Sequence, residues 1–191
     1  MYCPSNLKSA VLFSLLVLIP CTSGAFDYLQ PLPDTPIIPE NNALTKEKII
    51  LGKQLFFDTE LLGPKSSLSC NSCHNLAKGG SDNNALSIGQ GGKETRRSAP
   101  SLWNIGLQTV LYWDGRSISL ENQTLDHLRD PVISSWTSIG AIVTKLSQSS
   151  IYQQAFKNAF NEENPVSGIN IARAIASFER SLMTGKSPFD R

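Results

Sequence analysis

Metal-ligating side chains are scarce in this chain of 191 residues, which contains four cysteines and two histidines. A closed structural zinc site needs four ligands. After Cys73 and the His74 that follows it, the chain offers no further cysteine and one further histidine, His127. A zinc knuckle is therefore poorly supplied. No alternating strand pattern occurs either, so a thioredoxin-like CxxC pair would lack the βαβ unit to which it belongs.

An excess of charge of either sign is also missing. The formal net charge is +1, and Lys8 is the only charged side chain before residue 26. A chain that begins at residue 26 has 16 basic and 16 acidic residues, and therefore no net charge. This balance gives no indication of a nucleic acid or an anionic membrane as a partner.

Long apolar runs are limited to one stretch near the N-terminus. Residues 10–19 are predominantly apolar, about half the ~20 residues that a membrane-spanning helix requires. Lys8 supplies a positive charge before this run, Pro20 ends it, and the small residues 23–25 offer a cleavage site. We interpret residues 1–25 as a cleaved secretory signal peptide, with an uncleaved anchor as the alternative.

The motif that is present is CNSCH at residues 70–74, a CxxCH sequence typical of c-type haem attachment. The thiols of Cys70 and Cys73 can add to the two vinyl groups of one haem, and His74 can then bind the iron as an axial ligand. The other two cysteines lie within residues 1–25, so a mature chain would have no spare thiol. In bacteria haem c is attached outside the cytoplasm, and we expect a periplasmic protein with one covalent haem c.

Helical periodicity dominates residues 44–191, without internal repeats or a second CxxCH motif. Four prolines between residues 27 and 43 predict that segment 26–43 is an extended lead-in. A polar loop is expected at 81–99, and long ordered loops tend to carry function. The predicted class is all-α, with these helices: 45–57, with Thr45 as N-cap and Ile50, Leu51, Leu55 and Phe56 on one apolar face; a short helix from the CxxCH motif to Gly79-Gly80; 119–129; 137–147; 151–160; and 170–182, with Asn170 as N-cap.

Several phrases of the sequence resemble, in order and spacing, those of the N-terminal haem domain of the bacterial di-haem cytochrome c peroxidase and MauG family. The resemblance extends over residues 44–191 and implies a cytochrome c-like domain. The matching phrases are LGKQLFFD (51–58), CNSCHNLA (70–77), SIG (87–89), RSAPSLWN (97–104), WDGR (113–116), IASFERSL (175–182) and SPFDR (187–191).

The resemblance implies an oxidoreductase whose haem reduces hydrogen peroxide or forms high-valent iron. In the family, a second haem domain takes electrons from a small donor protein of cytochrome c or cupredoxin type. The tryptophan of the WDGR phrase lies between the two haems, so Trp113 is expected to transfer electrons; from the residues alone it would be a buried aromatic of the core. The sequence ends at Arg191, before the family's second domain, and we expect a separate second haem domain or a homodimer.

The distal positions of the site depart from the family pattern. Gln90 stands where the peroxidases carry a histidine, and Ile133 stands where they carry the catalytic glutamate. The distal glutamine of the family is matched by Gln123. Ser98 replaces a calcium-binding asparagine, which argues against a calcium site.

Peroxide cleavage moves a proton from the near oxygen to the far one, and a positioned acid–base group accelerates this step by ~10²–10⁴-fold. Gln90 and Gln123 can donate hydrogen bonds but cannot carry a proton at neutral pH. Arg97 can stabilise developing negative charge, or it can remain solvated or pair with a haem propionate. His127 shares a helix face with Gln123 and is a candidate sixth iron ligand or acid–base group; the alternative is a surface histidine.

These observations leave three hypotheses open. The first, which we favour, is a peroxidase-like haem oxidoreductase. The second is a mono-haem electron carrier, in which His127 or Met183 is a strong second axial ligand. The third is an inactive half that needs a C-terminal haem partner.

Overall fold

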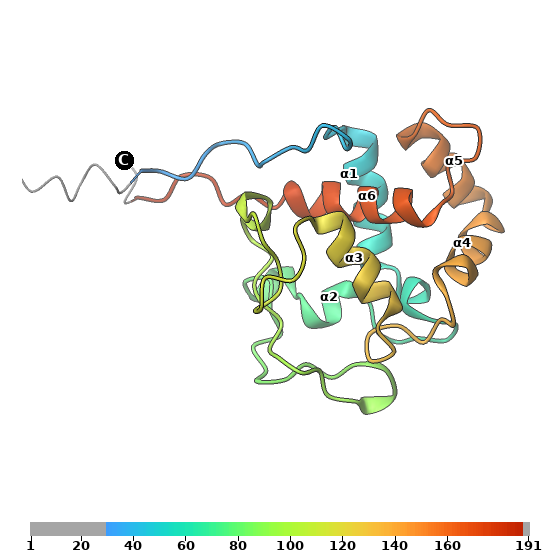
Figure 1. Cartoon of the computed structure of the whole chain (residues 1–191), viewed down its shortest axis with the longest axis horizontal. Helices are drawn as coiled ribbons and strands as arrows, with labels where there is room; N and C mark the ends of the chain where they lie inside the picture. The colour runs from blue at the N-terminus through green and yellow to red at the C-terminus, as the bar shows by residue number, and fades with distance from the viewer. Residues whose placement is uncertain (1–29, 189–191) are drawn as a thin grey trace, which may run out of the picture. The chain divides into compact units, whose positions relative to one another are not determined.

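The computed structural model describes residues 30–188, and the segment interpreted as a signal peptide lies outside the described residues. Leu32–Arg191 form one compact unit, without a strand in its described part, which confirms the all-α class. No helix within residues 30–188 is long and apolar enough to cross a membrane. The helices are α1 (Lys46–Phe57), α2 (Cys70–Cys73), α3 (Leu120–Arg129), α4 (Ile139–Ser147), α5 (Ser150–Ala159) and α6 (Gly168–Arg180), with 3₁₀ turns at Thr59–Leu62, Leu76–Lys78, Gln90–Gly92 and Ile105–Leu107 (Figure 1).

The longer helices begin at side chains that cap them. Thr45 accepts a hydrogen bond from the Lys48 amide at 3.3 Å, which confirms the predicted start of α1. The predicted cap of α6 at Asn170 is wrong, because Ser167 caps this helix by accepting from the Asn170 amide at 3.3 Å. Asn170 lies in the first turn, fully buried, and its side chain donates to Glu162 at 2.8 Å.

Two further details differ from the sequence-based expectation. Ile50 is 48% exposed, whereas the other three residues predicted for the apolar face of α1 are buried. The helix of the CxxCH motif ends at Cys73, earlier than predicted. A separate 3₁₀ turn at Leu76–Lys78 then leads to Gly79, whose φ of 78° lies in the left-handed region that glycine adopts without strain.

The core consists of two clusters of buried side chains, and α1 and α6 contribute to both. The first cluster also draws on α3, α4 and α5; it contains Leu51, Leu55, Leu61, Leu62, Leu128, Ile142, Leu146, Phe156, Phe160, Ile171, Ala174 and Ile175. The second cluster draws on α3 and the segment 102–111; it contains Phe56, Leu102, Ile105, Leu111, Leu120, Ala176, Phe178 and Leu182. Cys70 packs against this second cluster, so the core sets the position of the CxxCH motif.

Helices α1 and α6 are in close contact at Gly52. A Cβ atom placed on Gly52 would lie 1.9 Å from the carbonyl oxygen of Ala174 and 2.9 Å from Cβ of Phe178. A helix carbonyl cannot withdraw in the way that the end of a flexible side chain can. Any larger residue at position 52 therefore forces the two central helices apart.

We predict that Gly52→Ala destabilises the chain by about 1–3 kcal/mol, because overpacking shifts backbone in both helices. Urea denaturation of the purified chain measures this change. Gly140→Ala on α4 is a matched control, since the nearest atom to its new Cβ is the Ser138 hydroxyl at 3.6 Å. The control should be neutral or stabilised by up to about 1 kcal/mol. Equal stability of the two variants would contradict the prediction.

Candidate haem site

The CxxCH motif forms the one-turn helix α2. The Ser69 amide donates to the Ser72 hydroxyl at 3.0 Å, and the His74 amide donates to the Cys70 carbonyl at 2.9 Å. Cys70 and Cys73 are both free thiols. The turn therefore presents two thiols and one imidazole from five consecutive residues.

The environment of the two thiols argues against a redox-active pair. Burial raises the pKa of Cys70 to about 12, and the nearby Glu179 carboxylate acts in the same direction. Burial also raises the pKa of Cys73. A redox CxxC pair works through a thiolate whose pKa is lowered. The cysteines are therefore held as protonated thiols, which suits covalent attachment to a cofactor rather than disulfide exchange.

The ring of His74 is oriented by a backbone carbonyl. Its Nδ1 lies 3.0 Å from the carbonyl oxygen of Pro100, which can only accept, so Nδ1 carries the proton and Nε2 keeps its lone pair. Burial lowers the pKa of His74, which favours the neutral imidazole. A neutral ring with its other nitrogen hydrogen-bonded is the form in which histidine binds a metal. These three side chains fit a haem c.

A second cluster joins Tyr112 to two residues of α3, Gln123 and His127. The Tyr112 hydroxyl lies 2.9 Å from Nδ1 of His127 and 3.3 Å from the carbonyl oxygen of Gln123. The side-chain amide of Gln123 lies 3.0 Å from the same Nδ1. The rings of Tyr112 and His127 are stacked at 5.4 Å with 15° between their planes. His127 is thus partly buried and hydrogen-bonded, not the surface histidine of the alternative interpretation.

The protonation of His127 is controlled by its surroundings. The pKa of His127 is lowered to about 4, first by burial and then by the charge of His74. His127 is consequently neutral at pH 7. Among the described residues, its Nδ1 has three polar neighbours within 3.2 Å in Tyr112 and Gln123, whereas its Nε2 has only the Gln123 amide at 3.5 Å and is the less engaged nitrogen.

Arg116 of the WDGR turn also contacts the Tyr112 ring. The guanidinium carbon of Arg116 lies 3.3 Å from the centre of that ring. Arg116 is itself held by Asp114 through hydrogen bonds of 2.9 and 3.0 Å. Burial raises the pKa of Tyr112 to about 12, so its hydroxyl keeps its proton and can donate at neutral pH.

The structure does not bring Gln90 into this cluster. Its side-chain amide donates to the Ser66 hydroxyl at 2.8 Å and contacts the carbonyl oxygens of Ile133 and Leu62 at 3.2 and 3.3 Å. Both of its N–H groups are therefore occupied by protein acceptors. Ile133 packs its side chain against the first core cluster. Gln90 thereby links its own segment to the segments that contain Ser66 and Ile133.

The side chains of Trp113 and Arg97 are both exposed to solvent. Trp113 is 67% exposed, and its indole nitrogen donates to the Ser98 carbonyl at 3.1 Å. It is therefore not the buried core aromatic that the residues alone suggested. Val110 and Ile118, on either side of the turn, are 53% and 76% exposed. Arg97 is exposed, and its guanidinium donates to the carbonyl of the preceding residue at 2.8 Å.

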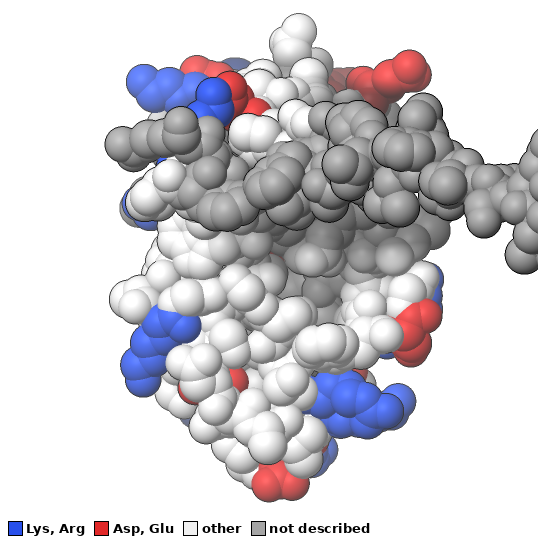
Figure 2. All heavy atoms as spheres, turned by 90° about the vertical axis from the view of Figure 1, so that its left-hand side faces the viewer, with Lys and Arg blue, Asp and Glu red and all other residues white. Residues whose placement is uncertain are grey.

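Figure 2 looks onto the side where, in Figure 1, the connecting segments between α2 and α3 lie. Apart from the residues drawn in grey, most of the surface in that view is uncharged, and the Lys, Arg, Asp and Glu side chains lie mainly near its edges.

Two contributors to the site were missed from the sequence, Tyr112 and the carbonyl of Pro100. Tyr112 adopts a φ of 67°, which is uncommon for a bulky residue, and no residue pattern signals it. The only available signal was position, since Tyr112 directly precedes the WDGR phrase. The contact of Pro100 with His74 spans 26 residues.

Comparisons with known proteins identify relatives of this chain. A family model described as di-haem cytochrome c peroxidase matches residues 46–191. The methylamine utilization protein MauG of Methylorubrum extorquens is 37% identical over 159 residues, which are 83% of this chain and 44% of that protein. The cytochrome c551 peroxidase of Pseudomonas aeruginosa is 34% identical over 162 residues, which are 84% of this chain and 46% of that protein.

A solved structure is also similar. The crystal structure of a MauG-like protein associated with microbial copper homeostasis has a TM-score of 0.75 and 33% identity, and the match covers 83% of this chain and 48% of that one. The chain thus spans about half the length of the relatives that it matches. The chain belongs to the di-haem cytochrome c peroxidase and MauG family, a family of haem c oxidoreductases with a cytochrome c-like all-α fold.

Proposed function

We propose that this chain is the peroxide-reacting haem domain of an exported oxidoreductase, with one haem c on Cys70, Cys73 and His74. The observation that carries the proposal is the CxxCH turn, which presents two thiols and one oriented imidazole from five consecutive residues. Nδ1 of His74 is bonded to the Pro100 carbonyl at 3.0 Å, and His127 on α3 is hydrogen-bonded to Tyr112 at 2.9 Å. When bound, the haem iron supplies the redox chemistry by which two electrons and two protons convert hydrogen peroxide to two water molecules.

His127 is the proposed proton carrier of the site. The amide of Gln123 and the hydroxyl of Tyr112 are hydrogen-bond donors that keep their protons at neutral pH. His127 can accept a proton at Nε2 when its Nδ1 carries the ring's other proton and donates it to the Gln123 carbonyl at 3.2 Å or to the Tyr112 hydroxyl oxygen at 2.9 Å. Because its pKa is about 4, the ring returns the proton readily to a leaving oxygen. His127 thus does the work of the family's catalytic glutamate, whose position is occupied by Ile133 in this chain.

Electrons are proposed to enter through Trp113. Its ring is exposed beside Val110 and Ile118, and a bare apolar group of this kind marks an interaction surface. The proposed partner is a second haem domain, on the same or a separate chain, that receives electrons from a small cytochrome c or cupredoxin-type protein. Residues 1–25 are proposed to direct export to the periplasm.

A second candidate function is favoured by the presence of a second, partly buried histidine on α3, His127. If Nε2 of His127 binds the iron opposite His74, the haem has two strong axial ligands and the domain is an electron carrier. In that case peroxide finds no open position. The spectrum of the oxidised protein distinguishes the two candidates.

We predict that the haem-loaded chain of residues 26–191 shows a high-spin ferric spectrum that changes on titration with hydrogen peroxide. An optical titration from the ferric state measures this, after a denaturing gel stained for haem has established covalent attachment. His127→Gln should slow the spectral change by ~10²-fold or more, since the proton carrier is lost. Lys157→Gln, on the exposed surface of α5, is the matched control and should react like the parent chain.

A low-spin spectrum that peroxide leaves unchanged would reject the peroxidase-like function and favour the electron carrier. A high-spin spectrum with equal rates for the His127→Gln variant and the parent would reject the role of His127 alone. Failure to attach haem when both cysteines are present would reject the haem site.

The pH dependence of stability gives an independent prediction. The pKa of His127 is about 4 in the folded chain, against an ordinary value of 6.5. Between these values the unfolded chain binds a proton that the folded chain does not, so stability falls as the pH drops from about 6.5 to about 4. In His127→Asn this contribution disappears, and urea denaturation at pH 7 and pH 4.5 should differ less than in the parent. An unchanged difference would contradict the prediction.

A further inference from the structure

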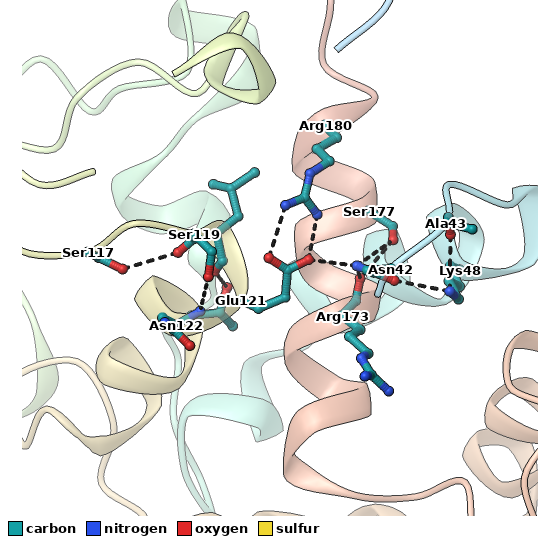
Figure 3. Close-up of polar contacts among 12 residues, drawn as sticks. Asn42, Ala43, Lys48, Ser117, Ser119, Glu121, Asn122, Arg173, Ser177 and Arg180 are labelled. Carbon is teal, nitrogen blue, oxygen red and sulfur yellow. Dashed lines mark hydrogen bonds and ion pairs between the residues drawn. The ribbon is translucent and has the colours of Figure 1, made fainter. Parts of the chain in front are cut away.

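A buried ion pair connects the first turn of α3 to the last turn of α6. The guanidinium of Arg180 donates to the two carboxylate oxygens of Glu121 at 2.6 and 2.9 Å. The two side chains are 6% and 10% exposed. Figure 3 shows the guanidinium and the carboxylate facing each other between the two helices. This two-point contact fixes direction as well as distance.

Asn42 adds a third connection to the same carboxylate. Its side-chain amide donates to Glu121 at 2.7 Å and to the Arg173 carbonyl at 3.0 Å, and its oxygen accepts from Lys48 at 3.0 Å (Figure 3). Asn42 is 1% exposed. The segment before α1, α3 and α6 therefore meet at one carboxylate, and α1 joins them through the bond of Lys48 to Asn42. We call Asn42, Glu121 and Arg180 the tether.

The tether differs from the other ion pairs of residues 30–188. Each of those pairs has at least one side chain that is 47% exposed or more. A buried ion pair is no better for stability than apolar residues of similar volume, because both charges lose their water. Its distinctive property is geometry, since a bidentate pair accepts one orientation whereas an apolar contact accepts many.

The tether acts on the helix that carries the second cluster of the site. Gln123 and His127 follow Glu121 by two and six residues in α3. Because a helix turns 100° per residue, a slide or rotation of α3 at Glu121 displaces both side chains. The bonds of Tyr112 to the Gln123 carbonyl and to His127 would then lengthen, and a misplacement of 1 Å is enough to impair a reaction.

We infer that Glu121, Arg180 and Asn42 are positioning residues that set the place of Gln123 and His127 in the proposed haem site. The inference rests on the proposed function for its consequence in peroxide chemistry. It requires no contact between the tether and any bound group, because α3 transmits the constraint.

The test compares haem-loaded variants of the full chain. Glu121→Gln and Arg180→Lys break the bidentate pair, and Glu121→Met with Arg180→Met replaces it by apolar side chains that can pack without direction. Leu146→Ala, in α4 and away from the tether, is the control for lost stability, since it opens a cavity in the first core cluster. The melting temperature of each of the four variants is measured first, so that effects on the site can be separated from lost stability.

The readouts are cyanide binding to the ferric haem, by optical titration with potassium cyanide, and amide hydrogen exchange of residues 123–127. We expect the three tether variants to bind cyanide about 3- to 10-fold more weakly, the equivalent of one lost hydrogen bond. We expect faster exchange in 123–127 as well. Leu146→Ala should keep the parent's affinity and the parent's exchange in this segment even where its melting temperature falls further.

Each outcome bears on the inference separately from the proposed function. Tighter cyanide binding in the tether variants would show that His127 leaves the iron, which rejects the open site but supports positioning. If the parent chain does not react with peroxide, cyanide binding and hydrogen exchange can both still be measured. If no haem is attached, hydrogen exchange alone tests the inference. Parent-like affinity and exchange in the double Met variant, or equal effects in Leu146→Ala, would overturn the inference.

Discussion

The close contact between α1 and α6 is the constraint on which the rest of the structure depends. Gly52 lets the Ala174 carbonyl approach α1 directly, and both core clusters form around that crossing. The second cluster receives Cys70, and α3 packs on α6 beside it. The haem-attachment turn and the helix with His127 are thus both mounted on one pair of helices. A change in the separation of α1 and α6 would therefore displace both the haem-attachment turn and the helix with His127.

Backbone groups determine how the site residues are oriented. The Pro100 carbonyl selects the tautomer of His74, and the Gln123 carbonyl accepts from the Tyr112 hydroxyl or from His127. A carbonyl has a fixed polarity, so these contacts hold over a wide pH range where a titrating partner would not. The site therefore keeps one arrangement of its imidazoles while their own protonation stays suppressed by burial.

Local signals made part of this structure predictable. The cap at Thr45, the CxxCH motif and the shared face of Gln123 and His127 depend on residues no more than four apart. Asn170 was misjudged because Ser167, also a good cap, lies three residues earlier and competes for the same helix start. The N-cap rule therefore predicted a capped helix correctly but placed the cap three residues too late.

The remaining features depend on tertiary contacts that no residue pattern encodes. The positive φ of Tyr112 turns its ring onto His127, although the sequence offers no glycine there. Gln90 reaches Ser66 and Ile133, which lie 24 and 43 residues away. The resemblance to the family identified Gln90 as a distal position but could not show that its amide is already occupied by protein acceptors.

The occupied amide of Gln90 clarifies why the position of α3 matters. In the family a histidine and a glutamate stand at the places of Gln90 and Ile133. Here the first joins connecting segments and the second packs against the core. Groups able to serve a bound oxygen are then concentrated on α3 and on Tyr112, which contacts it. When one helix carries these groups, an error in its placement cannot be compensated from a neighbouring loop, so a directional anchor at Glu121 has greater consequence than its small contribution to stability indicates.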